Sequence, residues 1–248
     1  MDGGALLVTV GGWREARVTG AHAETDSART IRLSVPGWPG SDPGQHVDIR
    51  LTAEDGYQAV RSYSLASFGD SEMIELAVDE IPDGEVSPYL VRDVRVGDQL
   101  EVKGPLGRYF VWRPETPGPV QLIAGGSGIV PLMSMVRAAQ AAGATDAVRL
   151  LYSVRAPHEA LYRSELEAAP AGAAADVRWA FTRSAPDGWA GAVGRVTEEV
   201  LRDATWPPER APLVFVCGPT GFVEHVADLL VGLGHAPEHV RTERFGGK

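Results

Sequence analysis

The sequence predicts a small antiparallel β-barrel domain over residues 1–115, followed by an α/β domain with a parallel sheet over residues 116–248. A chain of 248 residues is long enough for two domains of average size. The first half contains short strands separated by turn residues, whereas the second half alternates apolar strands with helical segments. Between them lies the proline-rich segment 113–119, which can continue neither a helix nor a central strand. We therefore place the domain boundary there.

The strands expected in the first half alternate apolar with polar residues, as half-buried strands do. Four runs show this pattern or a similar one: 30–35, 46–51, 74–78 and 99–102. Groups of glycine, proline and aspartate separate these runs, at 36–40, 42–44 and 96–98. Short strands with frequent turns are typical of a small antiparallel barrel.

After residue 119 the expected strands are 120–124, 148–152, 177–181 and 213–216, and the expected helices are 131–142, 163–168, 196–203 and 222–233. Strands that are apolar on both faces indicate a parallel sheet covered by helices on both sides. The second half is therefore expected to be an α/β domain.

Composition excludes several classes of function. The formal net charge of −10 argues against a protein that binds nucleic-acid phosphates, because that needs an excess of Lys and Arg. The single cysteine, Cys217, excludes an internal disulfide and an iron–sulfur or zinc site built on several cysteines, and the six histidines suggest no metal site. No apolar run approaches the roughly 20 residues of a membrane span, so we expect a cytoplasmic protein without membrane insertion.

The most specific motif of the second half is a glycine-rich loop that contains Gly126, Ser127 and Gly128. It directly follows an expected strand and precedes an expected helix, where glycines allow close approach of a pyrophosphate and the helix offers free N–H groups. Its spacing differs from the Gly-x-Gly-x-x-Gly pattern of ordinary dehydrogenases. The loop is either part of a dinucleotide site or only a tight strand-to-helix turn.

A second loop, with Cys217, Gly218 and Pro219, also joins a strand to a helix. The carboxyl ends of parallel strands meet at one edge of a sheet, so both loops should face the same crevice. Cys217 either contacts a ligand there or fills space as a small buried residue.

In the first half, Arg61, Ser62, Tyr63 and Ser64 place a cation, hydroxyls and an aromatic ring on one expected strand. An arginine can bind phosphate through two hydrogen bonds, a tyrosine can stack on a flat ring and a serine can donate to a ring nitrogen. The combination suits a flavin nucleotide. The alternative is a half-buried strand with an exposed arginine and a packed tyrosine.

A further turn, Gly84, Glu85, Val86 and Ser87, precedes Pro88 and an apolar helix start. Ser87 is expected to cap this helix. The turn is either an ordinary helix cap or a second anion site, where backbone N–H groups and the Ser87 hydroxyl hold a cofactor phosphate.

In this order the motifs resemble the ferredoxin–NADP reductase superfamily, in the form without a fused iron–sulfur domain, over nearly the whole chain. The resemblance implies that Arg61 binds the flavin phosphate, Tyr63 stacks on the isoalloxazine ring and Ser64 donates a hydrogen bond near N5. It also implies that the turn 84–87 binds phosphate, that the loop 126–128 binds the pyridine nucleotide, and that residues 217–219 border the nicotinamide.

By the same resemblance the flavin is FAD rather than FMN. In the family a hydroxyl residue and an arginine at the end of the third strand of the sheet clasp the 2′-phosphate of NADPH, and Thr182 and Arg183 occupy that position here. NADPH is therefore expected as co-substrate rather than NADH. Arg155 is either a second contact to this phosphate or a solvated loop residue.

The C-terminus departs from the plant-type pattern, which ends with a tyrosine stacked over the flavin. This chain continues to Lys248, and Phe245 is the candidate to cover the ring. Glu243 lies where related reductases keep an acidic residue near the active site, with a role in proton transfer. With Ser64 and Cys217 it completes our set of expected catalytic residues.

The resemblance implies a flavin-dependent oxidoreductase that transfers a hydride from NADPH to the flavin and passes electrons to a separate protein, such as a ferredoxin, a flavodoxin or an oxygenase component. Two alternatives stay open: an NAD(P)H:flavin reductase or diaphorase with a diffusible acceptor, and a nucleotide-binding module without catalysis. Lys103, Arg108 and Arg113 either contact an acidic partner or are solvated surface charges.

Overall fold

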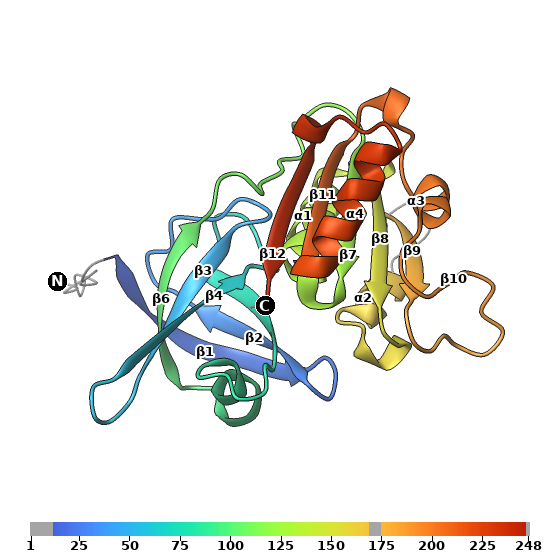
Figure 1. Cartoon of the computed structure of the whole chain (residues 1–248). Helices are drawn as coiled ribbons and strands as arrows, with labels where there is room; N and C mark the ends of the chain where they lie inside the picture. Colours follow the sequence, from blue (N-terminus) through green and yellow to red (C-terminus); the bar gives the residue numbers. More distant parts are fainter. Residues whose placement is uncertain (1–11, 169–174, 247–248) are drawn as a thin grey trace.

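The computed structural model describes residues 12–168 and 175–246, in which two six-stranded sheets follow one another along the chain (Figure 1). The first sheet is antiparallel and the second is parallel. The predicted fold class is therefore confirmed. The predicted boundary between residues 115 and 116 falls in the connection between the two sheets, and its exact position stays a prediction.

The first sheet has the strand order β4-β3-β6-β1-β2-β5. Its strands are β1 (Trp13–Ala23), β2 (Ala28–Ser34), β3 (His46–Thr52), β4 (Gln58–Ser64), β5 (Met73–Asp79) and β6 (Gln99–Leu106). Alternation places Ile31 and Leu33 in the core and Arg32 at the surface. Leu65, directly after β4, pairs with Leu76 of β5, so the two edge strands meet and the sheet closes into a barrel.

A single π-helical turn, Tyr89–Asp93, lies between β5 and β6. Its first flanking residue is Pro88, and no side chain caps it. The expected Ser87 cap is therefore absent, because the Ser87 hydroxyl accepts a hydrogen bond from the Ile81 N–H instead, at 3.0 Å. Ser87 thus closes the preceding turn rather than the helix.

The second sheet has the order β10-β9-β8-β7-β11-β12. Its strands are β7 (Val120–Gly125), β8 (Val148–Val154), β9 (Asp176–Phe181), β10 (Ala192–Val193), β11 (Leu213–Pro219) and β12 (Val240–Phe245), and its helices are α1 (Ile129–Ala142), α2 (Arg163–Ala168), α3 (Glu198–Ala204) and α4 (Thr220–Gly232). Leu122 and Leu150 share one buried cluster with α1, whereas Ile123 and Leu151 share another with α4. Helices therefore cover both faces, as the apolar strands predicted. None of the described helices is long and apolar enough to cross a membrane.

The two domains are joined by a partly buried arginine. Arg137 of α1 forms ion pairs with Glu75 of the barrel and Glu165 of α2, and donates to the Ala66 carbonyl at 2.9 Å. Burial lowers the pKa of Arg137, but its contacts with Glu165 and Glu75 raise that pKa more, so the guanidinium stays charged. The glycine loop at the start of α1 is thereby held at a fixed place relative to the barrel.

A close backbone contact lies at the same interface between the barrel and α1. The Gly44 N–H donates to Ser134 Oγ of α1 at 2.8 Å. Gly44 has φ +95°, and a Cβ there would lie 2.0 Å from the carbonyl oxygen of Phe110 and 2.6 Å from Cε of Met135 in α1. Only glycine allows this approach of the barrel to α1.

We expect Gly44→Ala to lower the free energy of unfolding by at least about 3 kcal/mol, because backbone strain and a steric clash act together. Gly97→Ala is the matched control, since Gly97 has φ +101° and no atom lies within 4 Å of the added Cβ. That control should lose only about 1 kcal/mol. Urea unfolding measures both values, and equal losses in the two variants would contradict the clash at the seam.

Candidate functional site

A cavity of about 620 Å³ lies between the barrel and the carboxyl ends of β7, β8, β9 and β11. The second domain contributes Gly125, Gly126, Ser127, Ser153, Val154, Arg155, Glu159, Leu161, Thr182, Pro219 and Phe222, and the barrel contributes Thr25, Ser27, Asp79, Glu80, Ile81 and Pro82. Ligands of parallel α/β sheets bind at this edge. The cavity is therefore the candidate site for a dinucleotide.

The two predicted loops meet at this edge. Strands β7 and β11 pair in register, with Ala124 opposite Cys217. Gly128 is so close to β11 that a Cβ on it would lie 2.1 Å from the Cys217 carbonyl oxygen. Gly126 and Ser127 line the cavity, whereas Gly128 is buried behind it. Close packing of the two loops therefore explains why residue 128 is a glycine. Gly126 and Ser127 form the surface of the cavity.

Three groups from both domains come together where β12 reaches the barrel. Glu243 lies beside Cys217 in the paired strands β11 and β12, and Ser64 Oγ donates to Glu243 Oε1 at 3.3 Å. Burial raises the pKa of Glu243 to about 7, although the hydrogen bond from Ser64 opposes this shift. The Glu243 carboxyl can therefore exist in both protonation states near neutral pH.

The Cys217 side chain is fully buried in the core cluster under α1. Burial, together with the charge of Glu243, raises the pKa of the thiol, so the neutral form is favoured. This placement matches the packing interpretation of Cys217, and of residues 217–219 only Pro219 lines the cavity. Gly218 and Pro219 continue β11, opposite Arg244 and Phe245, and Phe245 packs against the same cluster.

The four residues of the Arg-x-Tyr-Ser motif lie on β4. Tyr63 is half-buried against the barrel core, and burial raises the pKa of its hydroxyl to about 12. Arg61 forms an ion pair with Glu85, and Ser62 Oγ donates to Asp48 Oδ1 at 2.6 Å. These side chains do not line the cavity described above. Through Ser64, however, their strand contacts Glu243 at the edge of the second sheet.

The residues expected to recognise the 2′-phosphate lie at the end of β9. Thr182 lines the cavity, whereas the Arg183 side chain is exposed outside its lining. The Arg183 N–H donates to the Arg155 carbonyl at 2.9 Å, so the two arginines are adjacent. Arg155 lines the cavity, and its guanidinium lies 3.7 Å from Glu159. Of these two cations only Arg155 lines the candidate dinucleotide site, and Arg183 follows Thr182 at its margin.

Sequence reasoning missed the barrel wall of the cavity. Ser27 Oγ donates to Asp79 Oδ1 at 2.8 Å. Burial raises the pKa of Asp79, and the Ser27 hydrogen bond and the charge of Arg155 oppose the shift. These residues carry no motif, because they become neighbours only when the β1–β2 hairpin meets the end of β5. The sequence indicates this part of the cavity only through the turn residues Pro-Asp-Gly at 82–84, which lead into the expected anion site.

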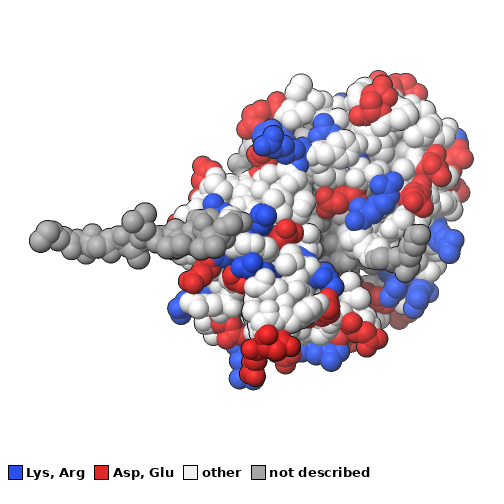
Figure 2. Space-filling view, turned by 60° about the vertical axis from the view of Figure 1, so that its left-hand side comes forward, with Lys and Arg blue, Asp and Glu red and all other residues white. Residues whose placement is uncertain are grey.

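Charges of both signs are interspersed over the face seen in Figure 2, with no large area of one sign. Of the basic residues considered for partner contact, Arg113 forms an ion pair with Asp42. Within the described residues, no three His, Cys, Asp or Glu side chains are grouped so that they could hold a metal ion.

The residue types along β4 and in the adjacent turn 84–87 fit a flavin. A half-buried tyrosine, a serine hydroxyl and an arginine lie along β4, and the turn 84–87 is adjacent through the Arg61–Glu85 pair. An aromatic face, a donor and a cation are the groups that an isoalloxazine ring and its phosphate require.

Comparison with known proteins agrees with this geometry. Residues 16–111 match the family model described as oxidoreductase FAD-binding domain, and residues 122–228 match the oxidoreductase NAD-binding domain. The two matches correspond to the barrel and the parallel sheet. The chain therefore has an FAD-binding and an NAD(P)-binding domain.

Two relatives that match most of this chain are named as reductases. It is 36% identical to ferredoxin–NADP reductase B of Sorangium cellulosum, over 82% of this chain and 85% of the relative. It is 28% identical to the ferredoxin–NAD(P)(+) reductase component of the naphthalene 1,2-dioxygenase/salicylate 5-hydroxylase systems of a Ralstonia species, over 92% of this chain and 67% of the relative. The structure of a ferredoxin reductase in carbazole 1,9a-dioxygenase superposes with a TM-score of 0.79, at 27% identity, over 94% of this chain and 69% of that one.

The fold, the order of the motifs and these matches confirm the predicted resemblance: this chain belongs to the ferredoxin–NADP reductase superfamily of NAD(P)H-dependent flavin oxidoreductases.

Proposed function

We propose that this chain is an NADPH-dependent reductase that passes a hydride from NADPH to bound FAD and then electrons to a separate redox protein. The observation that carries the proposal is the contact of Ser64 with Glu243, because it joins the Arg-x-Tyr-Ser strand of the barrel to the edge of the nucleotide-binding sheet. FAD held by the barrel would supply the redox chemistry, from acceptance of the hydride to release of single electrons to a carrier.

The protein groups position the reactants. Tyr63 would stack on the flavin ring, and Arg61 and the turn 84–87 would hold its phosphate. Ser64 would donate a hydrogen bond near N5 in place of the one that its single hydroxyl proton makes to Glu243 in this structure. Gly126 and Ser127 would receive the coenzyme pyrophosphate, the backbone of residues 217–219 would border the nicotinamide, and Phe245 would cover the flavin ring. Glu243, with its raised pKa, exchanges a proton at the seam.

The relatives support the proposed partner class, because one is named a ferredoxin–NADP reductase and another a reductase component of a dioxygenase system. A ferredoxin, a flavodoxin or an oxygenase component is therefore proposed as electron acceptor. A flavin reductase or diaphorase with a diffusible acceptor is the second candidate. The cytoplasmic location expected from the sequence stays a prediction.

The purified full-length protein should be yellow, and its visible absorbance should bleach when NADPH is added without oxygen. Acid extraction should release FAD. Cytochrome c reduction should rise at least about tenfold when a ferredoxin is supplied as intermediate carrier. Colourless protein without extractable flavin would contradict the reductase, and turnover with free flavin that ferredoxin does not increase would favour the diaphorase.

Coenzyme choice is tested by Arg183→Ala. Loss of a charge-assisted contact to the 2′-phosphate should lower kcat/KM for NADPH by about 10- to 100-fold and leave the value for NADH nearly unchanged. Arg178→Ala is the matched control, because it removes the same charge from β9 at a residue that pairs with Asp176. An unchanged preference in Arg183→Ala would exclude Arg183, and a loss in Arg155→Ala alone would assign the contact to Arg155.

The Glu243 carboxyl should make stability depend on pH. Because its pKa is raised from 4.5 to about 7, the protonated form is favoured in the folded protein, and this stabilisation is lost as pH rises from 4.5 through 7. Relative to Glu243→Gln, the wild type should lose about 3 kcal/mol of unfolding free energy over that interval. Urea unfolding at pH 4 to 8 measures the difference. Ser64→Ala should move the midpoint upward, and a pH-independent difference would show that Glu243 keeps an ordinary pKa.

A further inference from the structure

The arginine proposed to bind the flavin phosphate already has an anionic partner. Arg61 Nη2 donates to Glu85 Oε2, and Tyr57 donates its hydroxyl to the other oxygen, Glu85 Oε1, at 2.7 Å. Both oxygens of the Glu85 carboxylate are thus engaged. The charge of Arg61 is neutralised before any phosphate arrives.

The backbone that carries Glu85 is held in place. The Gly84 N–H donates to the Ile81 carbonyl at 2.9 Å, and the Ile81 N–H donates to Ser87 Oγ at 3.0 Å. A Cβ on Gly84 would lie 2.9 Å from that carbonyl oxygen, so the turn is tightly closed. The Glu85 side chain, by contrast, is 44% exposed. A ligand that pairs with Arg61 must therefore displace the side chain of Glu85, while the backbone of the turn stays in place.

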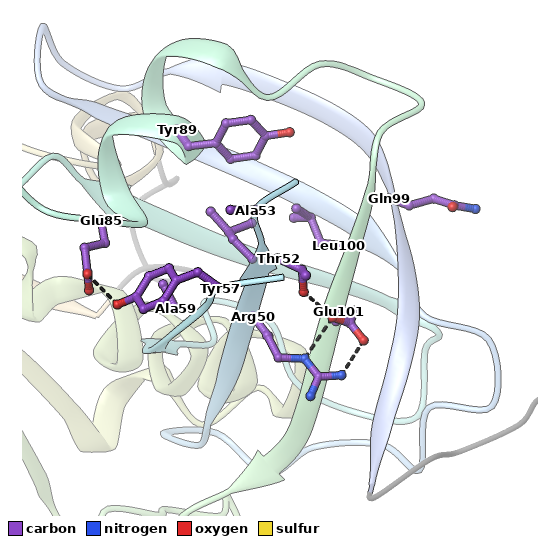
Figure 3. Close-up of a pocket in the computed structure, with 11 residues that line it drawn as sticks. Arg50, Thr52, Ala53, Tyr57, Ala59, Glu85, Tyr89, Gln99, Leu100 and Glu101 are labelled. Carbon is purple, nitrogen blue, oxygen red and sulfur yellow. Dashed lines mark hydrogen bonds and ion pairs between the residues drawn. The ribbon is translucent and has the colours of Figure 1, made fainter. Parts of the chain in front are cut away.

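Glu85 and Tyr57 line a pocket of about 530 Å³ at the end of the barrel (Figure 3). Arg50 is the only cation among the described residues that line it, and it already pairs with Glu101. Figure 3 shows this second pair across the pocket from the Tyr57–Glu85 contact. A displaced Glu85 carboxylate has room to move there but finds no free cation.

We propose that Glu85 competes with the flavin phosphate for Arg61 and thereby sets the affinity of this protein for phosphorylated flavins. The pyrophosphate of FAD carries two negative charges and the phosphate of FMN nearly two, against one for a carboxylate, and either group can accept two hydrogen bonds from one guanidinium, so it displaces Glu85. The cost is one broken ion pair and a carboxylate left beside the bound phosphate. The inference rests on the proposed function, because it takes the phosphate contact of Arg61 from there.

The test uses the full chain freed of flavin, titrated with FAD, FMN or riboflavin, and reads the dissociation constant from the change in flavin fluorescence. Glu85→Gln keeps the size of the side chain, removes its charge and replaces one of its two acceptor oxygens with an NH2 donor. It should tighten FAD and FMN binding roughly fivefold, the scale of a partly exposed ion pair. Riboflavin binding should be unchanged, because riboflavin has no phosphate.

Glu101→Gln is the matched control, since it removes one carboxylate from an arginine pair in the same pocket without touching Arg61. Its FAD affinity should equal that of the wild type. In an Arg61→Gln background, Glu85→Gln should change FAD affinity by less than about twofold.

Four results would overturn the inference: Glu85→Gln weakens FAD binding or leaves it unchanged, it tightens riboflavin equally, Glu101→Gln has the same effect, or the effect persists without Arg61. A wild type that binds no flavin would overturn the proposed function as well. If the wild type binds flavin and Glu85→Gln binds it with the same affinity, only the proposed competition between Glu85 and the phosphate is contradicted.

Discussion

The ion pairs of Arg137 are the constraint on which the rest of the structure depends. A charge removed from water is costly unless it is paired and hydrogen-bonded, and Arg137 meets this condition only when Glu75, Glu165 and the Ala66 carbonyl are all present. Glu75 and Ala66 belong to the barrel, and Glu165 belongs to the second domain. The arginine is therefore satisfied in one relative placement of the domains. Helix α1 is held in that placement, and so are the glycine loop before it and the cavity that faces the barrel.

The sequence alone was sufficient to predict those elements whose local residue pattern matches their burial in the structure. Strands β7, β8 and β11 are mostly apolar because helices cover both faces of their sheet, and such runs can be recognised without a structure. The glycine loop was recognisable because it lies between such a strand and a helix. Gly128, however, is required by the approach of the Cys217 carbonyl, a packing contact that a sequence motif cannot distinguish from ligand binding.

Other parts could not be predicted because their causes are not local. Strand β12 contains three charged residues in six and has only Val240 buried, so its sequence lacks a strand pattern, and pairing with β11 forms it. Strand β1 changes register between Val18 and Gly20, and this irregularity interrupts the alternation. The Arg61–Glu85 pair joins residues 24 positions apart, and the contact of Ser64 with Glu243 spans 179 positions. Only the closed barrel and its docked neighbour bring these groups together.

The shared wall of the cavity has a consequence for how such a protein can be recombined. Ser27, Asp79 and Pro82 come from the barrel, and Ser127, Ser153 and Thr182 come from the parallel sheet. Neither half on its own encloses this cavity, which is the candidate site for the coenzyme. A gene fusion that uses this reductase must therefore include both domains. If only the parallel-sheet domain were replaced by that of a distant homologue, the ends of its strands would face barrel residues that do not match them.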